Sequence, residues 1–449
     1  MKNVACISSL SALLGSLLVS ITATLVPAQA ETVPVAHATA VSTPMACGGV
    51  TSTGSGNQTP LVIDGYPCSG GGTAGAVNAP EEPFISVKIC APGSTTKCQI
   101  IDHIEVDTGS TGLRVAYSAL SSSLRPGSSG LPLVAGSASG TTLTECETYV
   151  DSYVYGPVVT ADVYIAGQYV KSTQMQVFGD SAYKVPKACS SQGGTQTDTT
   201  RTFGANGLIG VNFLLNDNYA PYYNCKNSTP SSCTANTGYA GLPNTVSQFA
   251  SNNNGVVLTL PAIAPGGTTA PVVGTLTFGV GTQGNNTPVA STLAVTNDGG
   301  SDANNGTFAA QVGGTWFTAY IDSGTDVVYF NDSANKNLVA CSSKNGYYCP
   351  TSTQAVPFTL ANTGSTVARG TLNYSVANAT TELSSNTIAY NNIAGPDGSS
   401  ATTNSSIGFG LSTFFGHNMY FLFQGKTAPG TGLGGGSTGT VTGPINGIN

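Results

Sequence analysis

Charged residues are scarce in this chain. Only 8% of its 449 residues are Asp, Glu, Lys or Arg, whereas about 25% is usual. The 14 Lys and Arg residues form no cluster and the net charge is −7, so the basic face that a nucleic-acid-binding protein needs is missing. Histidine is limited to three residues, and no Cys-x-x-Cys pair occurs. We therefore expect no nucleic-acid partner, no metal site and no cofactor.

Long apolar runs are confined to the start of the chain. Lys2 precedes an apolar segment from Ile7 to Val26, and Ala28-Gln29-Ala30 fits the small-x-small rule for signal-peptide cleavage, as does Ala36-His37-Ala38. A membrane anchor is the alternative interpretation of this segment. No later stretch reaches the ~18 apolar residues that a spanning helix needs. We expect a signal peptide over residues 1–30, no membrane span, and export to the periplasm or secretion.

The cysteines agree with export. Eleven are present, and an even number remains once Cys6 leaves with the leader, which predicts disulfides. Three pairs are spaced eight residues apart around a polar turn, and we expect each to staple a hairpin: Cys90 with Cys98, Cys225 with Cys233, and Cys341 with Cys349. By elimination, Cys146 would then pair with Cys189, and Cys47 would pair with Cys68. Cys47 lies far beyond the apolar segment, so we do not expect a lipid anchor there.

Short strands and turns dominate the rest of the sequence. The chain is 40% hydrophobic and contains 57 glycines, which is typical of a β-rich core with many turns. Alternating or β-branched segments occur at 84–89, 149–155, 158–165, 175–178, 255–260 and 274–279. A helix of two turns is expected only over Leu242 to Ser251. Residues 31–80 contain no Lys or Arg and predict a flexible lead-in, and residues 426–449 predict a flexible tail.

One tripeptide pattern occurs twice, once in each half of the chain. Asp107-Thr108-Gly109-Ser110 is matched by Asp322-Ser323-Gly324-Thr325, and each copy follows an apolar, strand-like segment. Glycine allows a tight turn in which main-chain N–H groups and neighbouring hydroxyls support a carboxylate. If the two turns face each other, Asp107 and Asp322 share a proton, and one acts as acid while the other acts as base. (The aspartic-protease pair is the standard example of this coupling.) The alternative is two unrelated turns with Asp at a cap-like position.

These motifs and their order resemble the pepsin-like aspartic endopeptidases from about residue 80 to 425. The segments 106–115 and 321–325 are similar to the two active-site turns of that family. The segments 206–211 and 407–411 resemble the apolar-apolar-Gly elements that thread beneath each Asp. The segment 153–170 resembles the flap hairpin, so Tyr155 and Gly156 match flap residues in contact with substrate. The same motif order also resembles a family of uncharacterised exported bacterial proteins.

The resemblance implies an all-β, bilobal pepsin-like acid protease fold, with two antiparallel β lobes and a central cleft. We expect an N-terminal lobe with the flap over 81–265 and a C-terminal lobe over 266–425. It also implies an exported aspartic-type endopeptidase that hydrolyses a peptide or protein substrate with an activated water, and we expect a monomer. Asp107 and Asp322 would be catalytic, supported by Thr108, Gly109, Ser110, Ser323, Gly324 and Thr325.

The sequence departs from the family pattern in several places: Gly408-Phe409 replaces the usual aliphatic pair before Gly410, residues 31–80 have no counterpart of the Lys-rich propeptide, and two single residues also differ. Arg114 stands where the family usually has Trp, and Pro157 removes a backbone donor next to the flap glycine. These departures leave open a catalytically weak pepsin-like shell that binds peptides or glycans. A structural surface protein is a third possibility, which only the Gly/Ser/Thr/Asn-rich composition favours.

Overall fold

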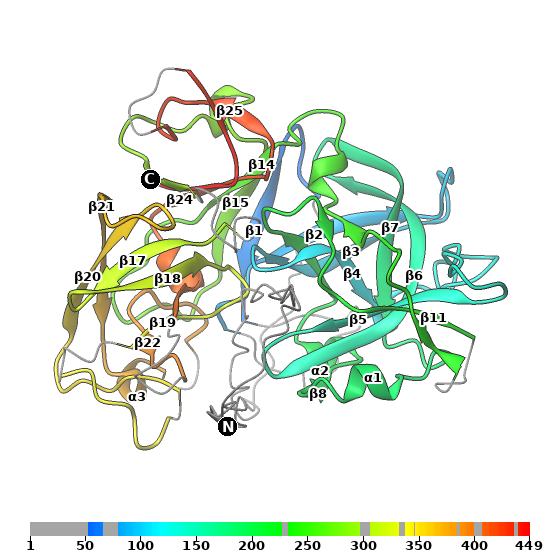
Figure 1. Ribbon diagram of the computed structural model, residues 1–449, viewed down its shortest axis with the longest axis horizontal. Helices are drawn as coiled ribbons and strands as arrows, with labels where there is room; N and C mark the ends of the chain where they lie inside the picture. The colour runs from blue at the N-terminus through cyan, green and yellow to red at the C-terminus, as the bar shows by residue number, and fades with distance from the viewer. Residues whose placement is uncertain are drawn as a thin grey trace, which may run out of the picture.

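A computed structural model of the chain describes residues 53–65, 80–226, 232–296, 306–331, 337–344, 346–383, 387–398, 406–434 and 439–449. The expected all-β, two-lobed fold is confirmed: the lobes lie side by side, with β1, β14 and β15 between them (Figure 1). The described α-helices are single turns: α1 (Lys187–Ser190), α2 (Thr200–Phe203) and α3 (Ala379–Glu382). None of the described helices has the length and apolar character needed to cross a membrane. The expected signal peptide lies outside the described residues.

The N-terminal lobe is built on a sheet that curls back on itself. Its strands follow the order β2-β3-β9-β4-β7-β6, and β6 pairs again with β2. The strands of this lobe are β2 (Phe84–Cys90), β3 (Cys98–Asp107), β4 (Thr111–Ala116), β5 (Thr142–Thr148), β6 (Ser152–Ile165), β7 (Gln168–Phe178), β8 (Thr195–Gln196), β9 (Gly207–Val211), β10 (Asn216–Asp217), β11 (Tyr222–Cys225), β12 (Thr234–Ala235) and β13 (Leu242–Pro243). β5 and β6 form an antiparallel hairpin, which we call the flap hairpin, with its tip at residues 149–151.

A second run of strands joins the two lobes. Its order is β1-β15-β14-β24-β27-β16, and its strands are β1 (Gln58–Ile63), β14 (Gly255–Thr259), β15 (Val272–Phe278), β16 (Leu293–Thr296), β24 (Asn418–Leu422) and β27 (Ile445–Ile448). On one side, Val62 of β1 pairs with Phe84 of the N-terminal lobe. On the other side, the Thr296 N–H donates to Asn362 of the C-terminal lobe at 3.0 Å. This sheet therefore ties both lobes into one molecule.

The C-terminal lobe has a sheet of seven strands in the order β21-β20-β17-β18-β23-β19-β22. The strands are β17 (Phe308–Val312), β18 (Thr315–Ile321), β19 (Val328–Tyr329), β20 (Gln354–Ala361), β21 (Ala368–Val376), β22 (Ala394–Gly395) and β23 (Ser406–Phe409). One apolar core runs through both lobes and the joining sheet, with members such as Ile209, Phe278 and Phe409. The fold is thus a continuous core with a lobe on each side.

Four disulfides lie within the described residues, and all four are pairings expected from the sequence. Cys90–Cys98, Cys225–Cys233 and Cys341–Cys349 each join cysteines eight residues apart, as the spacing predicts. Cys146–Cys189 is the fourth, with a Cα–Cα distance of 5.8 Å.

The fifth expected disulfide is not tested by the structure. Cys47 and Cys68 both lie outside the described residues. The bond between Cys47 and Cys68 therefore stays a prediction.

Two segments that we expected to be flexible contain strands. Residues 58–63, inside the expected lead-in 31–80, form β1, which pairs along its whole length with β15. In the expected tail 426–449, β27 pairs with both β24 and β16, while β25 (Thr427–Pro429) pairs with β26 (Thr440–Thr442). The partners are distant in sequence, so local composition does not reveal the backbone pairing that orders these segments.

The helix expected over Leu242 to Ser251 is also wrong. Leu242 and Pro243 form β13, and only Val246–Gln248 adopts a single 3-10 turn. The Asn244 side chain accepts a hydrogen bond from the Val246 N–H at 3.1 Å and donates to the Leu214 carbonyl at 3.1 Å. An Asn side chain that bonds nearby backbone groups in this way competes with helix formation.

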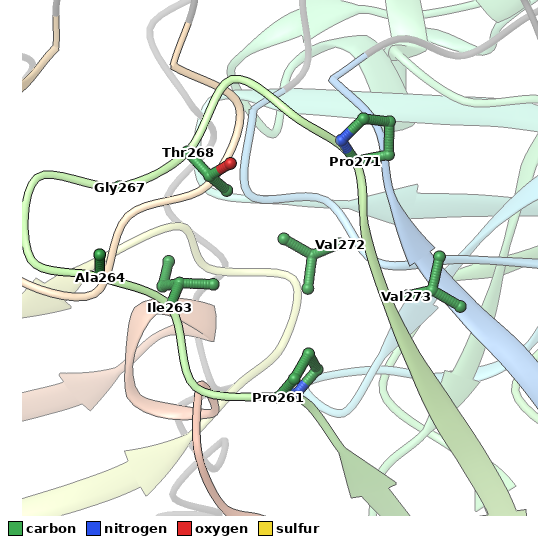
Figure 2. A pocket seen from close by; sticks show the side chains of 8 residues that line it. All are labelled: Pro261, Ile263, Ala264, Gly267, Thr268, Pro271, Val272 and Val273. Carbon is green, nitrogen blue, oxygen red and sulfur yellow. The ribbon is translucent and has the colours of Figure 1, made fainter.

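A pocket opens where the chain turns between β14 and β15 (Figure 2). Its volume is about 370 Å³ and its lining is mostly apolar: Pro261, Ile263, Ala264, Gly267, Thr268, Pro271, Val272 and Val273. None of these residues belongs to either Asp turn. The pocket is therefore a feature of the connection between strands and not of the candidate site.

Candidate active site

Each Asp turn joins two strands that flank a third. β3 ends at Asp107 and β4 follows the turn, while β9 runs parallel to β3 and antiparallel to β4 between them. In the other lobe, β18 precedes Asp322, β19 follows it, and β23 lies between them in the same way. A Cβ on Gly210 would approach the Ser110 carbonyl to 2.5 Å, and one on Gly410 would approach the Val327 carbonyl to 2.3 Å. The expected threading segments therefore lie against the two turns, and each needs glycine for its close approach.

The carboxyl groups of Asp107 and Asp322 accept hydrogen bonds from the same two kinds of donor. Asp107 accepts from the Gly109 N–H at 2.7 Å and from the Ser110 hydroxyl. Asp322 accepts from the Gly324 N–H at 2.9 Å and from the Thr325 hydroxyl at 2.9 Å. Each Asp is thus oriented by one backbone group and one hydroxyl of its own turn.

The two turns also hold each other across the lobe boundary. The Thr108 N–H donates to the Ser323 hydroxyl at 3.1 Å, and the Ser323 N–H donates to the Thr108 hydroxyl at 2.9 Å. Each hydroxyl donates in turn to a carbonyl of the opposite lobe, Ser323 to Val106 at 2.6 Å and Thr108 to Ile321 at 3.4 Å. These reciprocal bonds have approximate two-fold symmetry, and they fix the relative position of the two Asp residues.

The structure brings the carboxyl groups of Asp107 and Asp322 into contact. Both residues are fully buried. Burial, the negative charge of Asp107 and a hydrogen bond to Asp107 raise the pKa of Asp322 well above 3.8. A Cβ on Gly109 would lie within 2.7 Å of the Asp322 carboxyl, so glycine is needed there to let the second Asp approach. The pair can hold a proton between its two carboxyl groups.

The structure places Tyr155 away from this pair, which contradicts its expected flap role. Tyr155 pairs with Cys146 across the flap hairpin, whereas Glu145 pairs with Gly156. Side chains of neighbouring residues in a strand point to opposite faces, so Tyr155 points away from the face of Glu145. Its hydroxyl donates to Thr144 at 3.0 Å. The Tyr155 ring packs in a buried cluster that includes Cys146, Cys189 and Cys225. Gly156 lies where a Cβ would meet a carbonyl of β7 at 2.0 Å, so its role is close strand packing.

Tyr149, which the sequence interpretation missed, is the tyrosine at the tip of the hairpin. Its N–H donates to the Ser152 carbonyl at 2.8 Å and closes the turn. Its hydroxyl is buried without a hydrogen-bond partner. Burial and the negative charges of Glu147 and Asp107 raise its pKa well above 10. The Asp-Ser dipeptide at 151–152 is a turn signal that could have placed the tip here.

Further carboxyl groups surround the pair. Burial and the charges of Glu82, Asp107 and Asp322 raise the pKa of Glu105 well above 4.5. Asp326, next to the second turn, is buried and accepts from Tyr329 at 3.0 Å and from Tyr347 at 2.9 Å. The interface between the lobes is therefore rich in buried acids.

His103 lies on β3, the strand that ends at Asp107, but its ring contacts other residues. Its Nε2 lies 2.9 Å from Asp64 and its Nδ1 lies 3.1 Å from Asp102. Both ring nitrogens are therefore engaged by carboxylates away from the dyad. We assign His103 no part in the chemistry of the pair.

Among the described residues, Glu145, Glu147 and Asp217 form the group of carboxyls spaced closely enough to hold a cation. Arg114 already occupies that position: its Nη2 lies 2.9 Å from Glu145, 3.2 Å from Glu147 and in contact with Asp217. All four side chains are almost fully buried. The guanidinium, which carries the positive charge that balances these acids, stands where a metal ion would bind.

Comparison with protein families matches residues 54–437 to the family described as "Protein of unknown function (DUF3443)". The chain belongs to this family. No curated protein gives a significant match. A solved structure, the aspartic proteinase from Irpex lacteus, is similar with a TM-score of 0.47 and 14% sequence identity, over 87% of this chain and 96% of that chain. The DUF3443 family carries no described activity, so the chemistry of the site has to be argued from its geometry.

Proposed function

We propose that the protein is an aspartic-type endopeptidase that hydrolyses peptide bonds with the Asp107/Asp322 pair and an activated water. The observation that carries this proposal is the contact between two buried carboxyl groups, each oriented by its own turn and clamped across the lobes. Such a pair supplies an acid and a base at one point, which is what attack of water on an amide carbonyl requires.

In this mechanism Asp322 carries the shared proton, because burial and Asp107 both raise its pKa. The carboxylate partner removes a proton from water as the water attacks the carbonyl carbon. The protonated partner donates its proton to the carbonyl oxygen. As the C–N bond breaks, the proton taken from water passes to the leaving nitrogen, and a hydroxyl proton of the tetrahedral diol returns to the dyad. The donors of the two turns keep both carboxyl groups in place while the proton moves between them.

The substrate would be an extended peptide lying beneath the flap hairpin, whose tip carries Tyr149, a residue whose pKa is raised by burial and by the charge of Asp107. Four disulfides support an exported protein, periplasmic or secreted. The catalytically weak peptide- or glycan-binding shell is the second candidate. The occupation of the usual Trp position by Arg114, with its buried carboxyl partners, favours it.

Cleavage of a peptide library by the purified mature chain between about pH 3 and pH 7 tests the proposal. Asp107→Asn and Asp322→Asn should each reduce cleavage by about 10²–10⁴-fold, the usual contribution of general acid–base catalysis. Both should retain the circular dichroism spectrum of the wild type. Asp198→Asn, which makes the same change at a half-buried position outside the site, should keep full activity. If the wild type cleaves nothing, or if either site variant keeps full activity, the binding shell takes the place of the protease.

A further inference from the structure

Arg114 connects the strand after the first Asp turn to the flap hairpin. It lies on β4 and its Nη1 donates to the Thr111 carbonyl at 2.8 Å. Its Nη2 donates to Glu145 of β5 at 2.9 Å and contacts Glu147 of the same strand at 3.2 Å. Glu145 and Glu147 are two residues apart, so they point to the same face of the hairpin. One guanidinium therefore holds two successive inward positions of β5.

The same guanidinium binds a third acid from another segment. Arg114 Nη2 donates to Asp217 of β10, and Tyr222 of β11 donates its hydroxyl to Glu145 at 2.7 Å. The cluster contains three carboxyl groups and one guanidinium, all buried. Glu145 Oε2 and Arg114 Nε have no hydrogen-bond partner, and Glu147 Oε2 has only the ion pair with Arg114. With all three acids ionised, the cluster would bury an excess of negative charge with unsatisfied polar atoms, which is costly.

We propose that Arg114, Glu145, Glu147 and Asp217 form a charged anchor that positions the flap hairpin over the dyad, and that the anchor holds firmly in acid and loosens as the solution approaches neutral pH. This inference rests on the proposed peptidase function for its effect on catalysis. Arg114 is a positioning residue here, because it touches the hairpin and not the reacting atoms. With both Glu residues protonated, the guanidinium faces the single carboxylate of Asp217, whereas with all three acids ionised the cluster has a net charge of −2 and its carboxylates repel one another.

The titratable and charged groups that face Glu145 and Glu147 support an anchor that loosens as the pH rises. They are Arg114 on β4, Asp217 on β10, Tyr222 on β11, and Tyr239, Tyr149 and Asp107 around them. Burial raises the pKa of Glu145 to about 7 although Arg114 lowers it, and burial raises the pKa of Glu147 well above 4.5. Arg114 is the single cation among these groups, so nothing else offsets the second and third negative charges.

Hydrogen exchange of the β5 amides tests the anchor without any need for catalysis. Opening constants for residues 143–147, corrected for the intrinsic pH dependence of exchange, should rise about tenfold or more between about pH 5 and about pH 8, the factor of one pKa unit. Glu147→Gln keeps the side-chain shape and removes one charge, so its opening constant at pH 8 should approach the wild-type value at pH 5. Asp151→Asn removes the same charge from the exposed hairpin tip and should leave the pH dependence unchanged.

Two further variants separate charge from packing. Arg114→Lys keeps the charge but has a single nitrogen, which cannot serve the three carboxyls and the Thr111 carbonyl together, so the hairpin should exchange faster than in the wild type at both pH values. Glu145→Gln should act in the same direction as Glu147→Gln. An opening constant that does not change with pH in the wild type, or that changes equally in Glu147→Gln, would overturn the anchor.

Catalysis provides a second readout. In peptide cleavage, KM of the wild type should rise toward neutral pH more steeply than KM of Glu147→Gln, while the pH dependence of kcat changes less than that of KM because both carboxyl groups of the dyad are retained. A kcat profile that moves with Glu147→Gln, with KM unaffected, would contradict a positioning role. If no peptide is cleaved but hydrogen exchange behaves as expected, the anchor stands and the proposed peptidase function fails.

Discussion

Raising the pH from about 4.5 to about 8 should destabilise this protein, in contrast to proteins that lose stability in acid. Seven carboxyl groups among the described residues have a raised pKa, with burial as the largest cause in each: Glu81, Glu82, Glu105, Glu145, Glu147, Asp322 and Asp326. Above the ordinary pKa of Glu, the unfolded chain releases protons that the folded protein retains. The folded state then binds more protons than the unfolded state, so the free energy of unfolding falls as the pH rises.

Glu145 gives the size of the effect. Its side chain is fully buried, and burial raises its pKa from 4.5 to about 7. One pKa unit corresponds to about 1.4 kcal/mol. A rise in pH from 4.5 to 7 should therefore lower the free energy of unfolding by roughly 3 kcal/mol through Glu145 alone. His103 acts in the same direction: burial lowers its pKa, but Asp102 and Asp64 raise it to about 9. Its contribution is present below about pH 6.5 and is lost as the pH rises through about 9.

Urea unfolding followed by circular dichroism, at intervals of about one pH unit from pH 4.5 to 8, measures the effect. The midpoint should move to lower urea as the pH rises, with an unchanged m-value. Glu145→Gln should show a shallower fall, because it cannot release the proton. A stability that rises with pH, or an equal fall in Glu145→Gln, would refute the assignment of these acids as buried and protonated.

Two further predictions concern single side chains of the site. Thr108→Ala should lower the free energy of unfolding by about 1–3 kcal/mol, because it leaves the buried Ser323 N–H without a partner; Thr108→Ser should retain most of the stability, and urea unfolding distinguishes the two. Tyr149→Phe should raise KM for peptide cleavage with little effect on kcat, whereas Tyr155→Phe should leave KM unchanged because its hydroxyl binds Thr144; equal effects of the two variants on KM would contradict the placement of Tyr149 at the site.

The parts of the site that the sequence predicted are those encoded locally. Each Asp, the glycine two residues later and the hydroxyl residue that follows lie within four residues, directly after a strand, so their pattern indicates the turn directly. The hairpin disulfides were predicted for the same reason, since their spacing already implies a short loop. The pairing of Asp107 with Asp322 needed one further step, the assumption that duplicated turns face each other.

The parts that the sequence interpretation missed depend on register and on distant partners. Assigning the flap tyrosine to Tyr155 instead of Tyr149 shifts the residue from the tip into the strand, where it points to the disulfide side of the hairpin. Arg114 is a single basic residue in the sequence, and its acids come from β5 and β10, which are far apart in the chain. No local pattern connects them, so only the fold reveals the cluster.

The cross-lobe hydrogen bonds and the carboxyl pair depend on each other. Thr108 and Ser323 bind across the lobes with the residues next to the two Asp side chains, so a movement of one lobe moves one carboxyl relative to the other. Two ionised carboxyls at this position would repel and strain these same bonds, whereas a shared proton removes the repulsion. At a pH at which the dyad holds one proton, this repulsion between the lobes is therefore absent. The predicted stability in acid and the proposed activity in acid thus share one physical origin, carboxyl groups that burial keeps protonated.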